Sequence, residues 1–436
     1  MAIQNFPAAL QPIIQQGFLE REFQEGIHSR LGFRAIADRE NFPNKIGETI
    51  TKTRRGLKAP TTTPLTPSAN TNLDNGLTPA GWTVEQYTLA INMYGDTIDL
   101  NMVTQGVGIA NQFMQNARVN GVQAAQSLDR LARNALYGAY LGGNTRVVTT
   151  LGAPGTTVAV DDIRGFRQVM SNGVMQATSV TYPMTVTIGS NSYTVTGFAA
   201  DGVNVSTAPN GISGTLTTSA NVSVADGTAG NAVVSSVAPA VLRPNGRATT
   251  KAITTGDTLT MSAVLAAVAQ HRSNNVPDIN GAYNVYLDDQ QLLGLFADAD
   301  FKLLYRGAYG SDTYRNGQII ELLGARFITT TEAPQQASLG AGAIHRAIVC
   351  GQGALIEGNY ASTGYSDLAS EDSLKVMVDD ICMVTREPLD RLQQIIAQSW
   401  YWVGGYALPT DVTANATIIP TANNAYFKRG IVIESL

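Results

Sequence analysis

Charged residues are scarce in this chain of 436 residues. Asp, Glu, Lys and Arg make up 14% of it, against about 25% in an ordinary soluble domain. The formal net charge of −5 does not suit a free nucleic-acid binder, which usually carries a strongly basic surface. Because 44% of the residues are hydrophobic, a normal core can still form. The low charge indicates a protein that covers much of its surface with copies of itself.

Cysteine is nearly absent, and sorting signals are missing. Cys350 and Cys382 are too few for a disulfide framework and form no CxxC pair for zinc, so we expect two small buried side chains. The N-terminus has no basic segment followed by an apolar one. No apolar stretch approaches the length of about 18 residues that a membrane span needs. We therefore expect a soluble protein made in the cytoplasm, with no membrane partner.

The residue patterns of enzyme sites are also missing. The three histidines, His28, His271 and His345, have no second histidine or cysteine at metal-ligand spacing. No HExxH, GxSxG or GxxxxGK[ST] motif occurs, and the partial glycine pattern at 106–111 lacks its third glycine. Carboxylate pairs at 161–162, 288–289 and 379–380 are more typical of helix caps and turns than of catalytic acids. The sequence predicts no enzyme, no cofactor and no metal site.

The strongest pattern that is present is helical and covers residues 103–141. Apolar or small residues recur there every three or four positions, and Gly142-Gly143 is placed to end the helix. Such a helix is roughly 55 Å long. Most of its apolar stripe is alanine or glycine, so another element must pack closely against it.

Before this helix lie an arm and a hairpin. Leu19, Phe23 and Ile27 recur at helical spacing within the arm, residues 1–40. Residues 46–53 and 82–98 are predicted strands, and the stretch 59–79 between them is rich in Thr, Pro and Asn. A loop of this length is unusual in a compact domain. We interpret it as the tip of a projecting hairpin that lies on a neighbouring molecule.

The hairpin carries a basic cluster, Lys52, Arg54, Arg55 and Lys58. These side chains are either solvated, or paired with an acidic neighbouring subunit, or in contact with nucleic acid. Together with Trp82 they are our candidate subunit-contact residues.

Residues 145–252 form a separate module by composition. Between Gln168 and Leu242 only Asp201 and Asp226 are charged, and turn residues separate short alternating runs. This pattern is typical of a small all-β sandwich or barrel. One segment within it, residues 161–170, is a candidate helix.

Residues 255–436 return to mixed character. We expect a helix at 261–268, a strand at 283–287, and a helix through 290–293 that Asp288 or Asp289 caps. A further helical turn is expected at 299–305, and strands at 325–331, 347–350, 374–378, 381–385, 395–406 and 430–434. The expected fold class is α+β, with one long helix, a projecting hairpin and a β insert.

The order of these parts resembles the Hong Kong 97-type fold of tailed-bacteriophage major capsid proteins. In that family the parts are an N-arm, an E-loop, a P-domain with a long spine helix, and an A-domain. Residues 286–305, YLDDQQLLGLFADADFKLLY, are similar to the strand-and-helix run of A-domains, and residues 315–334 to a strand segment that ends before a proline. The β insert departs from the minimal fold, although some related coats carry a β-rich insertion domain near the A-domain.

The resemblance implies a division of the chain into six parts. They are the N-terminal arm (1–43), the E-loop (44–98), the spine helix of the P-domain (99–144), the β-rich insertion domain (145–252), the A-domain (253–350), and the remaining A- and P-domain strands with the C-terminus (351–436).

The resemblance also implies a function, which is assembly. Pentamers and hexamers would build the icosahedral head around double-stranded DNA, in the virion, after assembly in the cytoplasm of a host bacterium. The implied partners are the chain itself, a portal protein, a separate scaffolding protein, in some phages a decoration or cement protein, and DNA bound without sequence specificity. Some members cross-link a lysine to an asparagine between subunits, but no partner residues match here, and no cross-link is predicted.

Two other functions remain open at this stage. A surface-binding or adhesin-like protein would use the β insert to contact carbohydrate, and an α/β enzyme would need a convergent polar pocket. Particle size separates them, because only a shell protein should form pentamers, hexamers or large particles.

Overall fold

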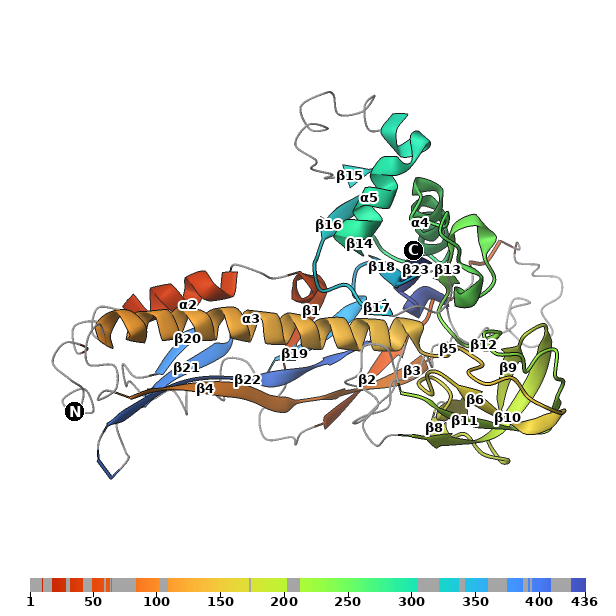
Figure 1. Ribbon diagram of the computed structural model, residues 1–436, viewed down its shortest axis with the longest axis horizontal. Coiled ribbons are helices and arrows are strands. Elements are labelled where there is room, and N and C mark those ends of the chain that lie inside the picture. The colour runs from red at the N-terminus through yellow and green to blue at the C-terminus, as the bar shows by residue number, and fades with distance from the viewer. Residues whose placement is uncertain are drawn as a thin grey trace.

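Figure 1 shows a computed structural model of the chain. It describes residues 10, 18–28, 32–41, 49–58, 60–62, 64, 84–101, 109–171, 174–201, 212–303, 321–336, 342–359, 375–386, 391–392, 394–408 and 425–436. These residues form an elongated helix–sheet layer, a β-barrel and a mixed α/β unit.

The helix–sheet layer is built on α3 (Ile109–Leu141), which runs along its length (Figure 1). A six-stranded sheet lies against α3, and its longest strand is β22 (Ile395–Ala407). β4 (Asn92–Asn101) pairs antiparallel with β22 from Asn92 opposite Gly404 to Asn101 opposite Ile395. The other strands are β1 (Ala37–Asn41), β19 (Leu355–Asn359), β20 (Lys375–Val378) and β21 (Ile381–Arg386).

The core of this layer lies between α3 and one face of the sheet. Burial alternates along β22, with Ile396, Trp400 and Trp402 buried, because successive side chains of a strand point to opposite faces. These residues pack with Phe113 and Leu128 of α3. The intervening residues of β22 therefore face away from the helix.

Helix α2 (Phe18–His28) packs against α3 at two glycines. A Cβ atom on Gly121 would lie 2.5 Å from the carbonyl oxygen of Phe23, and one on Gly26 would lie 2.7 Å from that of Arg118. The two backbones therefore touch where no larger residue fits. This contact confirms that another element packs closely on the small-residue stripe of the long helix.

The predicted hairpin is present beside the layer. β2 (Thr49–Arg55) and β3 (Val84–Ala90) pair antiparallel as a two-stranded sheet. At the base of the hairpin, Tyr87 and Leu89 pack with Ile356 and Ala407 of the six-stranded sheet. Most of the stretch 59–79 lies outside the described residues.

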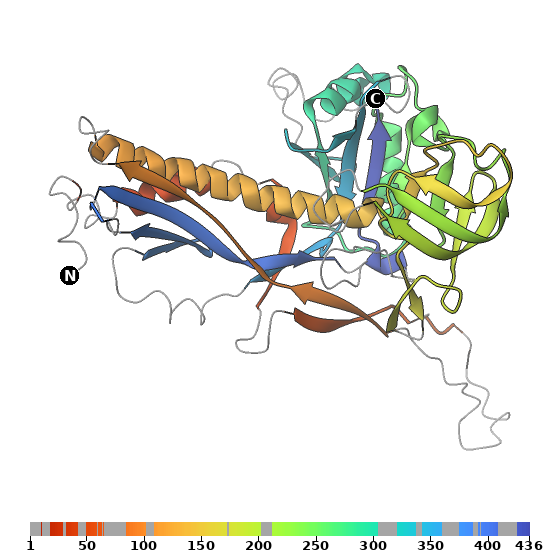
Figure 2. The same cartoon turned by 60° about the horizontal axis from the view of Figure 1, so that its bottom comes forward.

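The insert contains a closed β-barrel (Figure 2). Its strand order is β5-β12-β9-β10-β11-β6. The ring closes because Val147, next to β5, bridges Val160 of β6, and because the N–H of Val148 donates to the carbonyl of Ala159 at 2.9 Å. The strands are β5 (Asn144–Arg146), β6 (Gly155–Val160), β9 (Met184–Ile188), β10 (Asn191–Ala200), β11 (Gly214–Val222) and β12 (Ala232–Ser235), with a separate hairpin of β7 (Gln168–Ser171) and β8 (Val174–Ala177).

The helix predicted at 161–170 is wrong. These residues form turns and the start of β7. Gly165 has a φ of +84°, which a right-handed helix does not accept. The carbonyl of Arg164 accepts a hydrogen bond from the N–H of Gly143 at 2.8 Å, so this backbone binds the end of α3 instead of forming a helix.

The barrel joins α3 without a linker. Gly142 and Gly143 alone separate α3 from β5. The carbonyl of Gly143 accepts a hydrogen bond from the N–H of Ser235 at 2.8 Å, so the chain enters and leaves the barrel at one place. A Cβ atom on Gly165 would lie 2.1 Å from the nitrogen of Gly143. The barrel and the end of α3 are therefore in direct backbone contact.

The α/β unit contains the second large sheet, with strand order β13-β23-β18-β14-β16-β15 and β17 beside β18. Helices α4 (Met261–Ser273) and α5 (Asp289–Ala297) pack on one face. Tyr137 and Tyr140 of α3 pack on the other face. The strands are β13 (Val241–Leu242), β14 (Tyr283–Leu287), β15 (Glu321–Leu322), β16 (Ala325–Thr329), β17 (Gln335–Gln336), β18 (Ile344–Cys350) and β23 (Gly430–Ser435).

The expected α+β class is confirmed. The strand at 283–287 has the predicted bounds, and Asp288 caps α5 by accepting a hydrogen bond from the N–H of Gln291 at 2.8 Å. Neither β1 nor β19 was predicted from the sequence.

Candidate assembly surfaces

The basic cluster of the hairpin is divided between its base and its far end. Lys52 forms an ion pair with Glu40 of β1, and the other oxygen of Glu40 accepts a hydrogen bond from the Tyr87 hydroxyl at 3.4 Å. Lys52 therefore fixes the base of the hairpin to its own chain. Arg55 and Lys58 are exposed.

The remaining two predicted contact residues are less fully described. The backbone of Arg54 lies in β2 opposite Glu85 of β3. Trp82 lies outside the described residues. The role of all five residues in subunit contacts stays a prediction.

A second candidate surface is the face of the six-stranded sheet that points away from α3. Met93 of β4 lies opposite Val403 of β22 in the register, and the Met93 side chain is 74% exposed. The next residues of this face are polar, since the Ser399 hydroxyl donates to the Thr97 hydroxyl at 2.8 Å on an exposed part of the sheet. Among the described helices, α2 and α3 lie on the opposite side (Figures 1 and 2).

A third feature anchors the arm to the layer. The short 3-10 helix η2 (Phe33–Ile36) follows α2. The Asp129 carboxylate of α3 accepts hydrogen bonds from the N–H groups of Gly32 and Arg34, both at 3.0 Å. Burial raises the pKa of Asp129, and these backbone hydrogen bonds oppose the rise. Asp129 therefore acts as an N-terminal cap supplied by another helix.

The side chain of Arg34 completes the anchor. Its guanidinium binds Glu357 of β19 through both carboxylate oxygens, with Nη2–Oε1 at 2.7 Å and Nε–Oε2 at 3.0 Å. The two side chains are 2% and 0% exposed. The guanidinium also lies 5.9 Å from the ring centroid of Trp402. This pair could not be predicted from the sequence, because 323 positions separate the two residues and neither belongs to a motif.

Three of the titratable residues singled out in the sequence, His345, Cys350 and Cys382, are buried. His345 Nδ1 contacts the same Asp288 carboxylate that caps α5. Cys350 and Cys382 are buried, as expected, and neither forms a disulfide. Burial raises the pKa of both thiols, which disfavours the reactive thiolate.

The described part of the chain holds no group of three or more His, Cys, Asp or Glu side chains that could bind a metal. None of its helices is long and apolar enough to cross a membrane.

His271 predicts a loss of stability in acid. Its Nε2 lies 3.0 Å from the Val349 carbonyl, and burial lowers its pKa from 6.5 to about 4. The folded state therefore resists protonation that the unfolded chain accepts, so stability is full above pH 6.5 and falls as the pH drops toward 4. This difference between the pKa of His271 in the unfolded and folded states corresponds to about 3 kcal/mol of stability. The melting temperature of the wild type should fall more steeply between pH 7 and pH 4.5 than the melting temperature of His271→Phe. Equal slopes for the two proteins would contradict this assignment.

Comparison with known proteins gives structural likeness only. No protein-family model matches the chain, and no curated protein sequence does. Among solved structures, the capsid asymmetric unit of cyanophage Pam1 has 11% identity and a TM-score of 0.49, covering 95% of this chain and 91% of that one. The capsid of Ralstonia phage GP4 has 12% identity and a TM-score of 0.48, covering 93% and 88%. The capsid of cyanophage P-SCSP1u has 10% identity and a TM-score of 0.46, covering 93% and 88%. At these values the likeness assigns neither a fold family nor a function by itself.

Proposed function

We propose that this chain is the major capsid protein of a tailed bacteriophage, and that it acts as a structural shell subunit and not as an enzyme. The proposal rests on the helix–sheet layer. One face of its sheet packs on α3, while the opposite face exposes Met93, which is 74% accessible. We infer that this outer face of the sheet contacts a neighbouring subunit and that the contact buries Met93.

We infer that the hairpin and the outer sheet face contact each other in neighbouring copies of the chain. The base of the hairpin is held by Lys52 and by the cluster around Tyr87, and Lys58 beyond it is exposed. We infer that the far end of the hairpin lies on the outer sheet face of the next subunit. Repeated around an axis, such a head-to-tail contact closes into a ring.

The same proposal includes the partners of a phage head. The shell would consist of pentamers and hexamers, would be assembled with a separate scaffolding protein and a portal protein in the host cytoplasm, and would enclose double-stranded DNA. The net charge of −5 would limit adhesion of DNA to the wall. The barrel would be the insertion domain, 145–252, within the six-part division of the chain.

Electron microscopy of the expressed chain, alone and with its scaffolding protein, tests the proposal. Rings of five and six subunits and closed shells are expected. A chain that stays monomeric in size-exclusion chromatography at all concentrations and with every co-expressed partner would exclude a capsid role.

A single substitution tests the outer sheet face. Met93→Glu places a charge on a surface that we expect to become buried between subunits, where an unpaired charge is costly. Assembly should fall at least tenfold, while the melting temperature of the unassembled chain should stay the same because Met93 is exposed. The yield of shells in a sucrose gradient measures the effect.

Val180→Glu is the matched control. Val180 is 81% exposed but lies in the connection between β8 and β9, outside the sheet that contains Met93, so its substitution should leave the shell yield unchanged. Equal yields for the two variants would show that the outer sheet face is not a subunit contact.

A further inference from the structure

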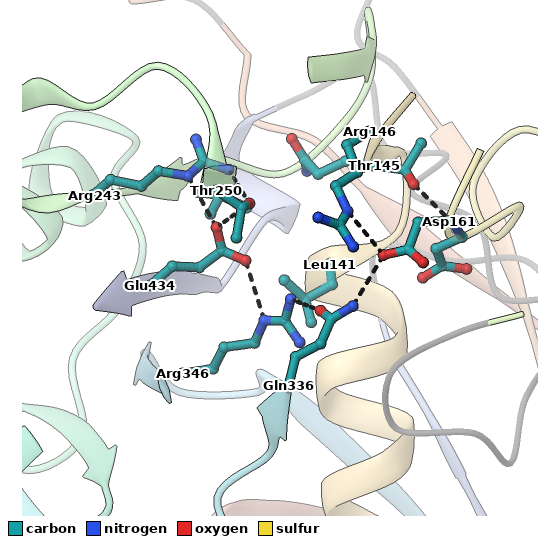
Figure 3. Close-up of a pocket in the computed structure, with 12 residues that line it drawn as sticks. Leu141, Thr145, Arg146, Asp161, Arg243, Thr250, Gln336, Arg346 and Glu434 are labelled. Carbon is teal, nitrogen blue, oxygen red and sulfur yellow. Dashed lines mark hydrogen bonds and ion pairs between the residues drawn. The ribbon is translucent and has the colours of Figure 1, made fainter. Parts of the chain in front are cut away.

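A small charged cavity lies where the barrel, the end of α3 and the second sheet meet (Figure 3). Its volume is about 40 Å³, which is enough for about one or two water-sized species. Three arginines line it, each from a different part of the chain. Arg146 comes from β5, Arg243 follows β13, and Arg346 comes from β18.

Two carboxylates pair with these arginines. Arg243 Nε and Arg346 Nε lie 2.9 Å and 3.1 Å from the two oxygens of Glu434, and the Thr250 hydroxyl donates to Glu434 at 2.7 Å. Arg146 Nε lies 3.2 Å from Asp161 Oδ2. Gln336 Nε2 donates to the same oxygen of Asp161 at 2.9 Å.

The charges of the described residues that line the cavity are unequal. Asp162 also lines it, but its carboxylate is bound on both oxygens by Arg164. Among the described lining residues this leaves three guanidinium groups and the two carboxylates of Asp161 and Glu434, an excess of one positive charge.

The state of Glu434 agrees with a positive cavity. Burial alone would raise its pKa, but the nearby charges of Arg346 and Arg243, with hydrogen bonds from Thr250 and Arg346, lower it below the usual value. Glu434 is therefore ionised and already counted in this balance.

Arg146 supplies the donors that face the cavity. Its Nε is used by Asp161, whereas its two Nη groups have no hydrogen bond or ion pair within the described parts of the chain. Figure 3 shows its guanidinium pointing from the barrel toward Leu141 and Arg346. Arg346 is itself only 6% exposed, so one wall of the cavity is a buried cation.

We infer that this cavity binds a monovalent anion of about the size of a water molecule, with chloride as the representative. The anion would accept hydrogen bonds from Arg146 Nη and would balance the excess charge. The bound anion would tie the barrel to the second sheet, whether or not the chain forms shells.

Thermal unfolding of the full chain tests this inference, with chloride exchanged for gluconate at constant ionic strength. Gluconate is too large for the cavity. A ligand that binds only the folded state raises the melting temperature, and we expect chloride to raise it by about 2–4 °C relative to gluconate. The ³⁵Cl resonance should also broaden in the presence of the protein, and bromide should reverse the broadening.

Four variants locate the effect. Arg146→Met and Arg146→Gln remove the charge and should abolish the chloride effect. The Gln variant also keeps a hydrogen-bond donor for Asp161, so it serves as the test if the Met variant does not fold. Arg146→Lys should retain it. Arg130→Met removes an arginine from an exposed ion pair with Glu332 and should also retain it. Equal melting temperatures in the two salts, or a chloride effect that survives in both neutral variants, would show that the cavity holds water only.

Discussion

Replacing Gly165 with Ala is expected to destabilise the chain by about 3–5 kcal/mol. A Cβ atom at this position would lie 2.1 Å from the nitrogen of Gly143 and 2.7 Å from the carbonyl carbon of Gly142. Both neighbours are backbone atoms at the end of α3, so no side-chain rotation can relieve the overlap. The turn that carries Gly165 and the helix end must separate, and thermal unfolding measures the cost.

Gly281→Ala is the matched control for this substitution. Gly281 has a φ of +89°, close to the +84° of Gly165, but nothing lies within 4 Å of its Cβ position. The control variant therefore carries only the backbone strain, about 1–2 kcal/mol. If both variants unfold at the same temperature, the contact between the barrel and α3 contributes nothing to stability.

The second large effect is expected at the buried ion pair of the arm. Either Arg34→Met or Glu357→Leu leaves one charge unpaired in a site where the side chains are 2% and 0% exposed, and should cost about 3–5 kcal/mol. The double variant removes both charges and should recover most of that loss, because apolar side chains can replace a buried pair at little cost. Denaturant unfolding of the four proteins gives the coupling energy.

A more exposed ion pair in the same helix–sheet layer provides the comparison. Arg39 of β1 lies 3.3 Å from Asp380, and the two side chains are 52% and 27% exposed. Arg39→Met should therefore change stability by no more than about 1 kcal/mol. A loss at Arg39 as large as the loss at Arg34 would contradict the importance of burial, and a double variant less stable than both single variants would contradict the pairing.

Local patterns in the sequence predicted most of the secondary structure. Each prediction needed only a short stretch of neighbouring residues. The examples are the helical period of α3, the alternation of buried residues along β22 and the aspartate that precedes α5. β1 could not be predicted in this way. Its sequence is Ala-Asp-Arg-Glu-Asn, which has no apolar alternation, and it forms a strand only because β19 pairs with it in parallel. The pairing joins segments more than 300 positions apart, and the sequence alone does not bring them together.

The candidate site was predicted less well than the fold. The basic residues of the hairpin were chosen by charge, but charge alone does not distinguish Lys52, which pairs with Glu40, from Lys58, which is exposed. The helix expected at 161–170 failed for a similar reason. The φ of +84° at Gly165 is set by its contact with Gly143, and Gly143 belongs to a different element. Contacts between distant segments decided both outcomes.

The hydrogen bond between the N–H of Ser235 and the carbonyl of Gly143, 2.8 Å long, holds the two ends of the barrel segment next to each other. The first and last strands of the barrel begin and end side by side, so deleting everything between them would leave two chain ends that a short turn can bridge. A whole folded module can thus be gained, lost or exchanged at this point without altering the path of the rest of the backbone. The same geometry makes residues 144–235 a natural place to graft a foreign domain onto the protein.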